Sequence, residues 1–154
     1  MRAVIQRCRR AEVAVGGSAV AAIDRGLLTL VGVAPEDHDA AAAWLARKIA
    51  TLRVFDGPGG RFDLPVGAVG GAVLVVPNFT LYGDATRGRR TDWTGAAAAG
   101  SARRLFRQLV VDLADSGVPV AAGVFGADMT VTLEADGPVT LVVDTPPGSG
   151  GACP

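Results

Sequence analysis

The most suggestive chemistry in this sequence lies where an apolar run ends in polar side chains. Residues 70–76 (GGAVLVV) are typical of a buried strand, and they continue directly into Pro77, Asn78, Phe79 and Thr80. Ligand sites in sheet proteins are often built at strand ends, which makes Asn78 and Thr80 candidates for an active site. Thr80 alone is a weak nucleophile, because no base is in evidence to activate it. The alternative is that these side chains only satisfy backbone groups.

Other reactive residue types are scarce. His38 is the only histidine and lies in an acidic segment at the expected start of a helix, where a solvated side chain is the simplest interpretation. Any Ser-His-Asp or Cys-His site would have to use it. Cys8, at the end of the first expected strand, is interpreted as a buried apolar residue rather than a nucleophile. One histidine without paired cysteines gives no metal-ligand spacing, so we expect no metal and no cofactor.

Two further segments have chemical potential. Residues 83–100 form a polar, Gly-rich stretch of the kind that carries function, and its basic residues accompany Trp93. Guanidinium groups suit phosphates and an indole can stack on a base, so the segment is either an RNA contact or a solvated loop. Gly137 and Pro138 separate two strand-like runs. Because proline cannot donate to a strand ladder, it marks an edge, a turn or a special site.

The elements that must position these residues alternate between strands and two helices. Gly16-Gly17 predicts a hairpin turn, and the 3.6-residue spacing of apolar residues after Ser101 predicts a helix that Gly117 ends. The order of strands, helix, strand, helix and strands indicates an α+β fold: a compact single domain whose helices cover one face of a largely antiparallel sheet. Strands are expected at residues 1–8, 12–15, 18–23, 26–33, 62–64, 70–76, 118–122, 129–134 and 139–143, and helices at about 35–52 and 101–116.

Length and charge narrow the class of protein. A chain of 154 residues indicates one domain, expected at residues 1–145, followed by a disordered tail at 146–154 (PPGSGGACP). Fifteen basic residues cancel fifteen acidic ones, which excludes a wholesale polybasic nucleic-acid binder but allows a local basic patch. Two distant cysteines exclude a disulfide framework. Without a long apolar run or a signal-peptide pattern, the sequence predicts a soluble cytoplasmic protein with no membrane partner.

Several segments, taken in order, resemble one known family. Residues 77–81 (PNFTL) occupy the place of a Ser-Gln-x-Thr-Leu signature, and residues 123–129 (GVFGADM) match Gly-x-Phe-Gly-Ala-x-Met. Residues 135–140 (ADGPVT) lie where relatives have Asn-x-Gly-Pro-Val-Thr, while residues 1–7, 26–33 and 87–90 resemble the opening strand, central strand and basic loop. Over nearly the whole chain, the sequence resembles the D-aminoacyl-tRNA deacylases, often called D-tyrosyl-tRNA deacylases.

The resemblance implies a compact, barrel-like homodimer that hydrolyses a D-aminoacyl or glycyl ester at the 3′ end of tRNA. A Gly-cis-Pro pair of one subunit, here Gly137 and Pro138, would enter the other subunit's pocket and exclude L side chains, with Arg7 fixing its orientation. Backbone N–H groups near Phe79 and Thr80 would face the ester carbonyl. The remaining site residues implied are Asn78 in the catalytic segment, Phe125 and Met129 against the substrate, and Arg87, Arg89 and Arg90 against RNA, with no DNA partner.

The sequence departs from the family pattern at three positions. Pro77 replaces serine, Asn78 replaces glutamine, and Ala135 replaces an asparagine whose side chain could brace the Gly-Pro turn. These changes bear on chiral strictness, whereas Arg7 favours a fixed turn. Two alternatives therefore stay open: a diverged deacylase with a relaxed or different acyl-tRNA substrate, and a non-catalytic dimer that binds tRNA.

Overall fold

A computed structural model describes residues 1–86 and 88–147. The predicted RNA contact of Arg87 and the greater part of the predicted disordered tail, residues 148–154, lie outside the described residues. The strands are β1 (Arg2–Val15), β2 (Ser18–Ile23), β3 (Gly26–Gly32), β4 (Phe55–Gly57), β5 (Gly60–Leu64), β6 (Ala72–Pro77), β7 (Val120–Ala122) and β8 (Thr130–Asp144). The helices are α1 (Asp39–Thr51) and α2 (Ala99–Asp115), with short 3-10 turns η1 (Val66–Val69) and η2 (Phe79–Tyr82).

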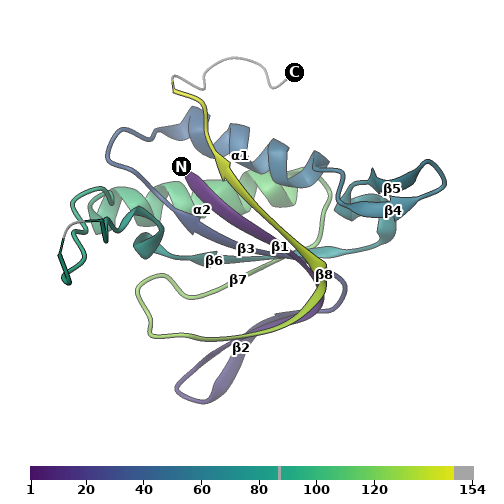
Figure 1. The fold of residues 1–154 in the computed structure, drawn as a ribbon, viewed down its shortest axis with the longest axis horizontal. Coiled ribbons are helices and arrows are strands. Elements are labelled where there is room, and N and C mark those ends of the chain that lie inside the picture. The colour runs from purple at the N-terminus through teal and green to yellow at the C-terminus, as the bar shows by residue number, and fades with distance from the viewer. Residues whose placement is uncertain (87, 148–154) are drawn as a thin grey trace.

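One bent, mixed sheet organises the chain, in the order β2-β1-β3-β6-β7, with β8 along the other side of β1. β1 pairs antiparallel with β2, β3 and β8, whereas β3–β6 and β6–β7 are parallel. Figure 1 shows both helices side by side on one face, and the β4–β5 hairpin at one end of the molecule. The predicted α+β class with two helices on one face is confirmed, and the two parallel pairings make the sheet mixed.

The two helices bury the stripes that their sequence spacing predicts. Leu45 and Ile49 of α1 and Leu105, Leu109 and Leu113 of α2 are almost fully buried against the sheet. Each such side chain removed from water contributes about 1.5–3 kcal/mol, so this layer fixes where the helices lie. Gly117 follows α2 in the left-handed conformation, at φ +82°, as predicted for the residue after a helix end.

Several elements differ from the sequence prediction: the strands expected at 1–8 and 12–15 form one strand, β1, and β4 was not expected. Two other differences have a cause that the contacts show. α1 begins at Asp39 rather than near Pro35, because the Asp37 carboxylate instead accepts the Ala34 N–H at 2.7 Å and closes a turn. The last two predicted strands form one strand, β8, whose pairing with β1 jumps from Gln6↔Thr140 to Cys8↔Ala135. Residues 136–139 therefore bulge out opposite a single residue of β1, Arg7. The Gly137-Pro138 signal marks a turn of the chain within this bulge, and the runs on either side of the turn pair with β1 rather than with each other.

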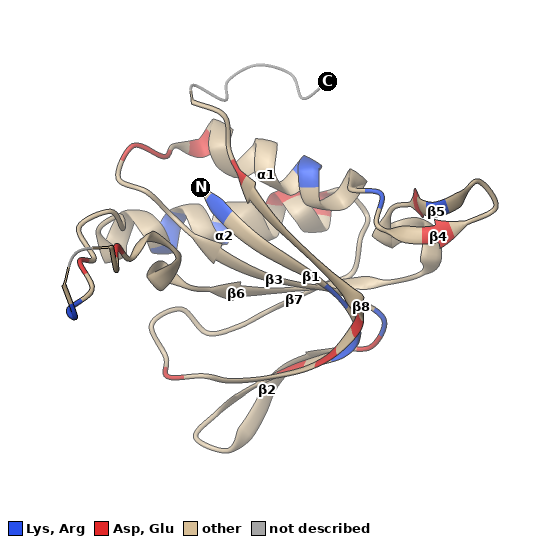
Figure 2. Cartoon of the chain, in the orientation of Figure 1, with Lys and Arg blue, Asp and Glu red and all other residues tan. Residues whose placement is uncertain are grey.

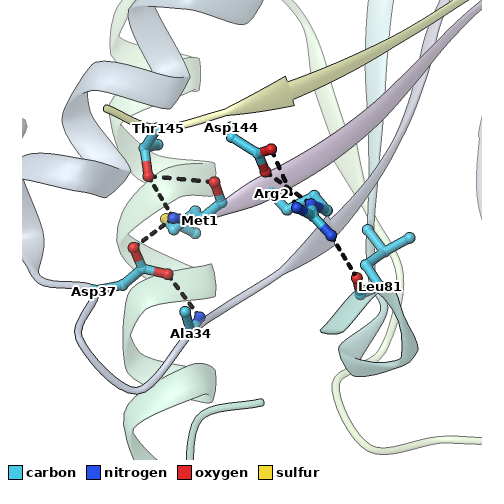
Figure 3. Close-up of polar contacts among 7 residues, drawn as sticks. All are labelled: Met1, Arg2, Ala34, Asp37, Leu81, Asp144 and Thr145. Atoms are coloured by element: carbon cyan, nitrogen blue, oxygen red, sulfur yellow. Dashed lines mark hydrogen bonds and ion pairs between the residues drawn. The ribbon is translucent and has the colours of Figure 1, made fainter. Parts of the chain in front are cut away.

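Polar contacts tie the start of β1 to the end of β8 (Figure 3). The amino group of Met1 contacts the Asp37 carboxylate and the Thr145 hydroxyl, and the Thr145 N–H donates to the Met1 carbonyl at 2.9 Å. The Asp37 side chain is itself nearly buried. The first strand, the turn before α1 and the end of β8 are therefore held together at one edge of the fold.

Candidate active site

A cleft of about 650 Å³ opens where β6 ends, between the first turns of α2 and the loop between β7 and β8. Its walls are mainly apolar, from Leu28 and Leu30 of β3 to Phe106 of α2. Among the described residues that line it, Asp128 carries the only ionisable side chain. An apolar cleft with a few polar groups is the usual form of a small-molecule site. This one offers amide, hydroxyl and main-chain groups rather than an acid–base pair.

Five of the residues predicted for the site line this cleft together. Asn78, Phe79 and Thr80 come from the segment that follows β6, and Phe125 and Met129 come from the loop between β7 and β8. Phe79 is 58% exposed although it is aromatic, and its ring meets Trp93 edge-on at 5.4 Å. The strand-end signal in the sequence therefore located one wall of the cleft.

The turn η2 has an internal cap that the sequence did not reveal. The Asn78 N–H donates to the Val31 carbonyl at 2.8 Å, and the Asn78 side-chain oxygen accepts both the Thr80 N–H, at 3.2 Å, and the Thr80 hydroxyl. The Thr80 N–H is therefore already hydrogen-bonded within the turn, and its predicted contact with a substrate carbonyl stays a prediction. Phe79 holds the first position of the turn, where an N–H has no acceptor within the helix, and Phe79 lines the cleft.

Arg2 connects η2 to the end of β8 (Figure 3). Its Nε and Nη2 donate to the two Asp144 carboxylate oxygens at 2.7 and 3.2 Å, and its Nη1 donates to the Leu81 carbonyl at 3.3 Å. The hydrogen bond from Arg2 lowers the pKa of Asp144, so the carboxylate is charged at neutral pH. Burial raises the pKa of Tyr82, whose ring lies 5.4 Å from the Arg2 guanidinium, so its hydroxyl stays protonated.

Removing the Arg2–Asp144 tie should impair the chemistry of the cleft more than it destabilises the fold. We expect Arg2→Gln and Asp144→Asn to lower kcat about tenfold, because a small displacement of η2 misplaces the groups beside the substrate. The pair is well exposed, so unfolding free energy should change by under about 1 kcal/mol. Steady-state kinetics and urea unfolding measure the two effects.

The matched control for this tie is Arg10→Gln, which removes an exposed ion pair with Glu12 on the same strand, away from η2. It should leave kcat unchanged.

The ion pair also predicts a pH dependence of stability. Because the pKa of Asp144 is lowered in the folded state, the pair contributes its full stabilisation above the carboxyl's ordinary pKa of 3.8, and this contribution is lost as pH falls through the lowered pKa. The free energy of unfolding of Asp144→Asn should therefore fall less than that of the wild type over this pH range. An unchanged kcat in both tie variants would contradict the assignment.

The predicted turn residues lie together, but away from the cleft of their own chain. The Gly137-Pro138 peptide is cis, and both residues are exposed and absent from the cleft lining. Arg7, only 8% exposed, donates from Nε to the Asp136 carbonyl at 3.2 Å and from Nη1 to the Val54 carbonyl at 2.7 Å. Its Nε also lies 3.0 Å from the Asp136 carboxylate. Arg7 thus braces the turn from within its own chain. Ala135 cannot contribute the side-chain hydrogen bonds of the asparagine that relatives have at this position.

The basic loop is pinned to the rim of the cleft. Asp84 and Asp92 exchange backbone hydrogen bonds at 2.8 and 2.9 Å, which closes the loop at its base. Trp93 then contacts Phe79, and a Cβ on Gly83 would lie 2.4 Å from the Trp93 ring, so a larger residue at Gly83 would displace Trp93. Arg89 and Arg90 are exposed within this loop and do not line the cleft.

Some cleft residues had no clear signal in the sequence. Gln6 and Asp128 line the cleft; strand alternation between buried Ile5 and Arg7 could have singled out Gln6. His38 borders a different, smaller hollow with Met1, and Cys8 is buried with a pKa raised by desolvation.

Across residues 1–86 and 88–147, no group of three or more His, Cys, Asp or Glu side chains could hold a metal ion. No helix in these residues is long and apolar enough to cross a membrane.

Comparison with known proteins decides the family. The family model described as D-Tyr-tRNA(Tyr) deacylase matches residues 4–144, which include every residue of the cleft. The chain belongs to this deacylase family. The D-aminoacyl-tRNA deacylase of Thermus aquaticus is 50% identical over 145 residues, covering 94% of this chain and 95% of that protein. The one from Geobacter metallireducens is 44% identical over 151 residues, covering 98% and 100%.

Solved structures agree with the deacylase fold. The structure of a c-Myc DNA Unwinding Element Binding Protein superposes with a TM-score of 0.88 at 33% identity, covering 95% of this chain and 99% of that one. A probable eukaryotic D-amino acid tRNA deacylase superposes with a TM-score of 0.80 at 15% identity, which supports the fold alone. The family resemblance predicted from the ordered motifs is confirmed.

Proposed function

We propose that this protein is a D-aminoacyl-tRNA deacylase, which hydrolyses the ester joining a D-amino acid, or glycine, to the 3′ end of tRNA. Water adds to the ester carbonyl, and the bond to the ribose oxygen breaks to release the free amino acid and tRNA. The observation that carries the proposal is the placement of the family's signature segment, Asn78–Thr80, on an apolar cleft without an acid–base pair. The reaction takes place in the cytoplasm, where aminoacyl-tRNA is made and used.

The chemistry of the cleft suits a substrate that is already activated. An aminoacyl ester needs a positioned water and a polarised carbonyl, and positioning alone can supply several kcal/mol. The free N–H of Phe79 is the donor we assign to the developing oxyanion, with the terminal ribose hydroxyl assisting. Phe125 and Met129 supply apolar surface for the aminoacyl group, and the exposed Arg89 and Arg90 contact the RNA backbone.

A homodimer completes the site in this proposal. Gly137 and Pro138 are exposed and do not line the cleft of their own chain. Arg7 links this turn to the Val54 carbonyl just before β4, whereas the cleft opens at the segment that follows β6. Among the described strands, β8 pairs with β1 alone, and it carries exposed apolar side chains, among them Leu141 and Val142, the latter 65% exposed. A second copy that covers this strand would bring each turn to the other subunit's cleft, where its wall excludes L side chains.

The direct test is incubation with D-Tyr-tRNA, L-Tyr-tRNA and Gly-tRNA. We expect rapid release of D-tyrosine and glycine and little release of L-tyrosine. Hydrolysis without preference for the D substrate would favour the diverged deacylase. Binding of tRNA without turnover would favour the non-catalytic dimer.

Thr80 provides a test of the main-chain mechanism. Its hydroxyl donates to the amide oxygen of Asn78, which is not a base and cannot take up its proton. We expect Thr80→Val to lower kcat/KM no more than about tenfold, the loss of one ordinary hydrogen bond. Single-turnover deacylation measures this directly. A loss of about a thousandfold or more, restored by Thr80→Ser, would instead identify the hydroxyl as a nucleophile.

A further inference from the structure

A row of arginines lies on the outer face of α2, outside the cleft and outside the motifs that define the family. Arg103, Arg104 and Arg107 line a shallow groove of about 310 Å³ together with Gly100, Gln108 and Val111. All three arginines are exposed. The ribbon of α2 is coloured for basic residues in its first part (Figure 2), and the acidic residues of this helix, Asp112 and Asp115, come at its C-terminal end.

The row has charge left to offer a ligand. Arg104 is paired with Asp39 of α1, but neither Arg103 nor Arg107 forms an ion pair with any described residue. Residues four apart on a helix are neighbours, with Cβ atoms about 5–6 Å apart, so Arg103 and Arg107 present two adjacent positive charges. The first turn of α2 contains no acidic residue that would oppose them.

One end of the row touches the cleft. The Arg103 guanidinium lies 5.1 Å from the centre of the Phe125 ring, and Phe125 lines the cleft. α2 itself is the wall between the two features, because Ala102 and Phe106 face the cleft while Arg103 and Arg107 face outward. An extended ligand whose end lies in the cleft can therefore continue over this helix.

We propose that the Arg103–Arg107 row of α2 binds the phosphate backbone of the RNA whose acylated 3′ end occupies the cleft. The inference rests on the proposed function for the identity of the RNA. Guanidinium groups bind phosphate oxygens in a forked geometry, without reading base sequence, which suits an enzyme that must act on many tRNAs. The row extends the RNA contact beyond the loop that carries Arg89 and Arg90.

The salt dependence of tRNA binding tests the row. Uncharged tRNA is titrated with wild type, Arg103→Gln, Arg107→Gln and the double variant over a series of KCl concentrations. Each single change should lower the slope of log K against log salt by about one, and the double change by about two. Arg103→Lys keeps the charge without the guanidinium fork and should retain most of the slope. The matched control is Arg47→Gln, an exposed arginine on α1, which should leave the slope unchanged.

Kinetics separate this proposal from the proposed function. With D-aminoacyl-tRNA, the Arg107→Gln variant should raise KM and leave kcat unchanged, whereas with a D-aminoacyl ester on a short CCA oligonucleotide both constants should match wild type. Slopes that stay unchanged in the double variant, or equal losses on both substrates, would overturn the proposal, as would equally tight binding of a DNA duplex. Wild-type protein that binds tRNA with the expected slope but hydrolyses neither ester would overturn the proposed function and leave the binding surface standing.

Discussion

Replacing Arg7 with alanine should raise the hydrolysis of L-aminoacyl-tRNA relative to D-aminoacyl-tRNA by about tenfold or more, which corresponds to about 1.4 kcal/mol. Both enantiomers carry the same chemical groups, so a site can reject one of them only through a clash. A flexible wall would yield to an L side chain, so the strength of the clash depends on how rigidly the wall is held. In this chain the wall proposed is the turn at Gly137 and Pro138, and Arg7 is the side chain that holds it.

The contacts of Arg7 explain the size of this effect. Its buried guanidinium satisfies the carbonyls of Val54 and Asp136 and lies against the Asp136 carboxylate. Alanine leaves both carbonyls without their donor and removes the closer ion pair of the Asp136 carboxylate. Because Asp136 retains some access to water, we expect a loss of about 2–3 kcal/mol in unfolding free energy, below the cost of breaking a fully buried pair. Urea unfolding and the ratio of kcat/KM for the two enantiomers measure both consequences.

Arg9 provides the matched control. It lies on the same strand and also faces Asp136, at 3.7 Å, but its side chain is 69% exposed. Arg9→Ala should change the stability by no more than about 0.5 kcal/mol, as for other surface substitutions, and should preserve the chiral ratio. Arg7→Lys should fall between wild type and Arg7→Ala, because an ammonium keeps the charge but loses the fork. A normal chiral ratio in a folded Arg7→Ala protein would contradict the bracing role.

The parts of the fold that the sequence predicted well are those that local rules determine. The α2 stripe, the Gly117 stop and the Gly16-Gly17 turn depend on spacing or on a positive φ, and the structure has all three. The position of the candidate site was also predictable, because an apolar strand that runs into Asn78 and Thr80 breaks its own pattern. The ordered motifs then indicated the family over nearly the whole chain.

What the sequence could not reveal depends on partners distant along the chain. Asp37 looked like a helix-start charge, but its contact with the Met1 amino group and the Ala34 N–H delays the helix to Asp39. The residue types left Gly137-Pro138 open as an edge, a turn or a special site, because only the register of β8 against β1 shows that both flanking runs belong to one strand. The capture of the Thr80 N–H by Asn78 is likewise a matter of side-chain geometry that residue types do not specify.

A mixture of two inactive variants should regain activity if the turn serves the other subunit. The first variant, Gly137→Ala, disrupts the turn: the residue has φ +132°, and an added Cβ would lie 2.7 Å from the Val139 nitrogen. The second, Ala127→Trp, fills the cleft from the loop that lines it. Each alone should lose most D-aminoacyl-tRNA deacylation, because every site in either homodimer has one damaged half.

Unfolding and refolding the two variants together forms mixed dimers. In a mixed dimer the intact cleft of one chain receives the intact turn of the other, so random assortment should restore about a quarter of wild-type sites. Size-exclusion chromatography checks that the mixture is dimeric. The control is Gly137→Ala alone, unfolded and refolded in the same way, which should stay inactive. A turn that acts on its own chain would leave the mixture as inactive as its parts, since no chain would then hold both halves intact. Recovery depends only on which chain each half comes from, so it tests the shared site without any assumption about how water is activated.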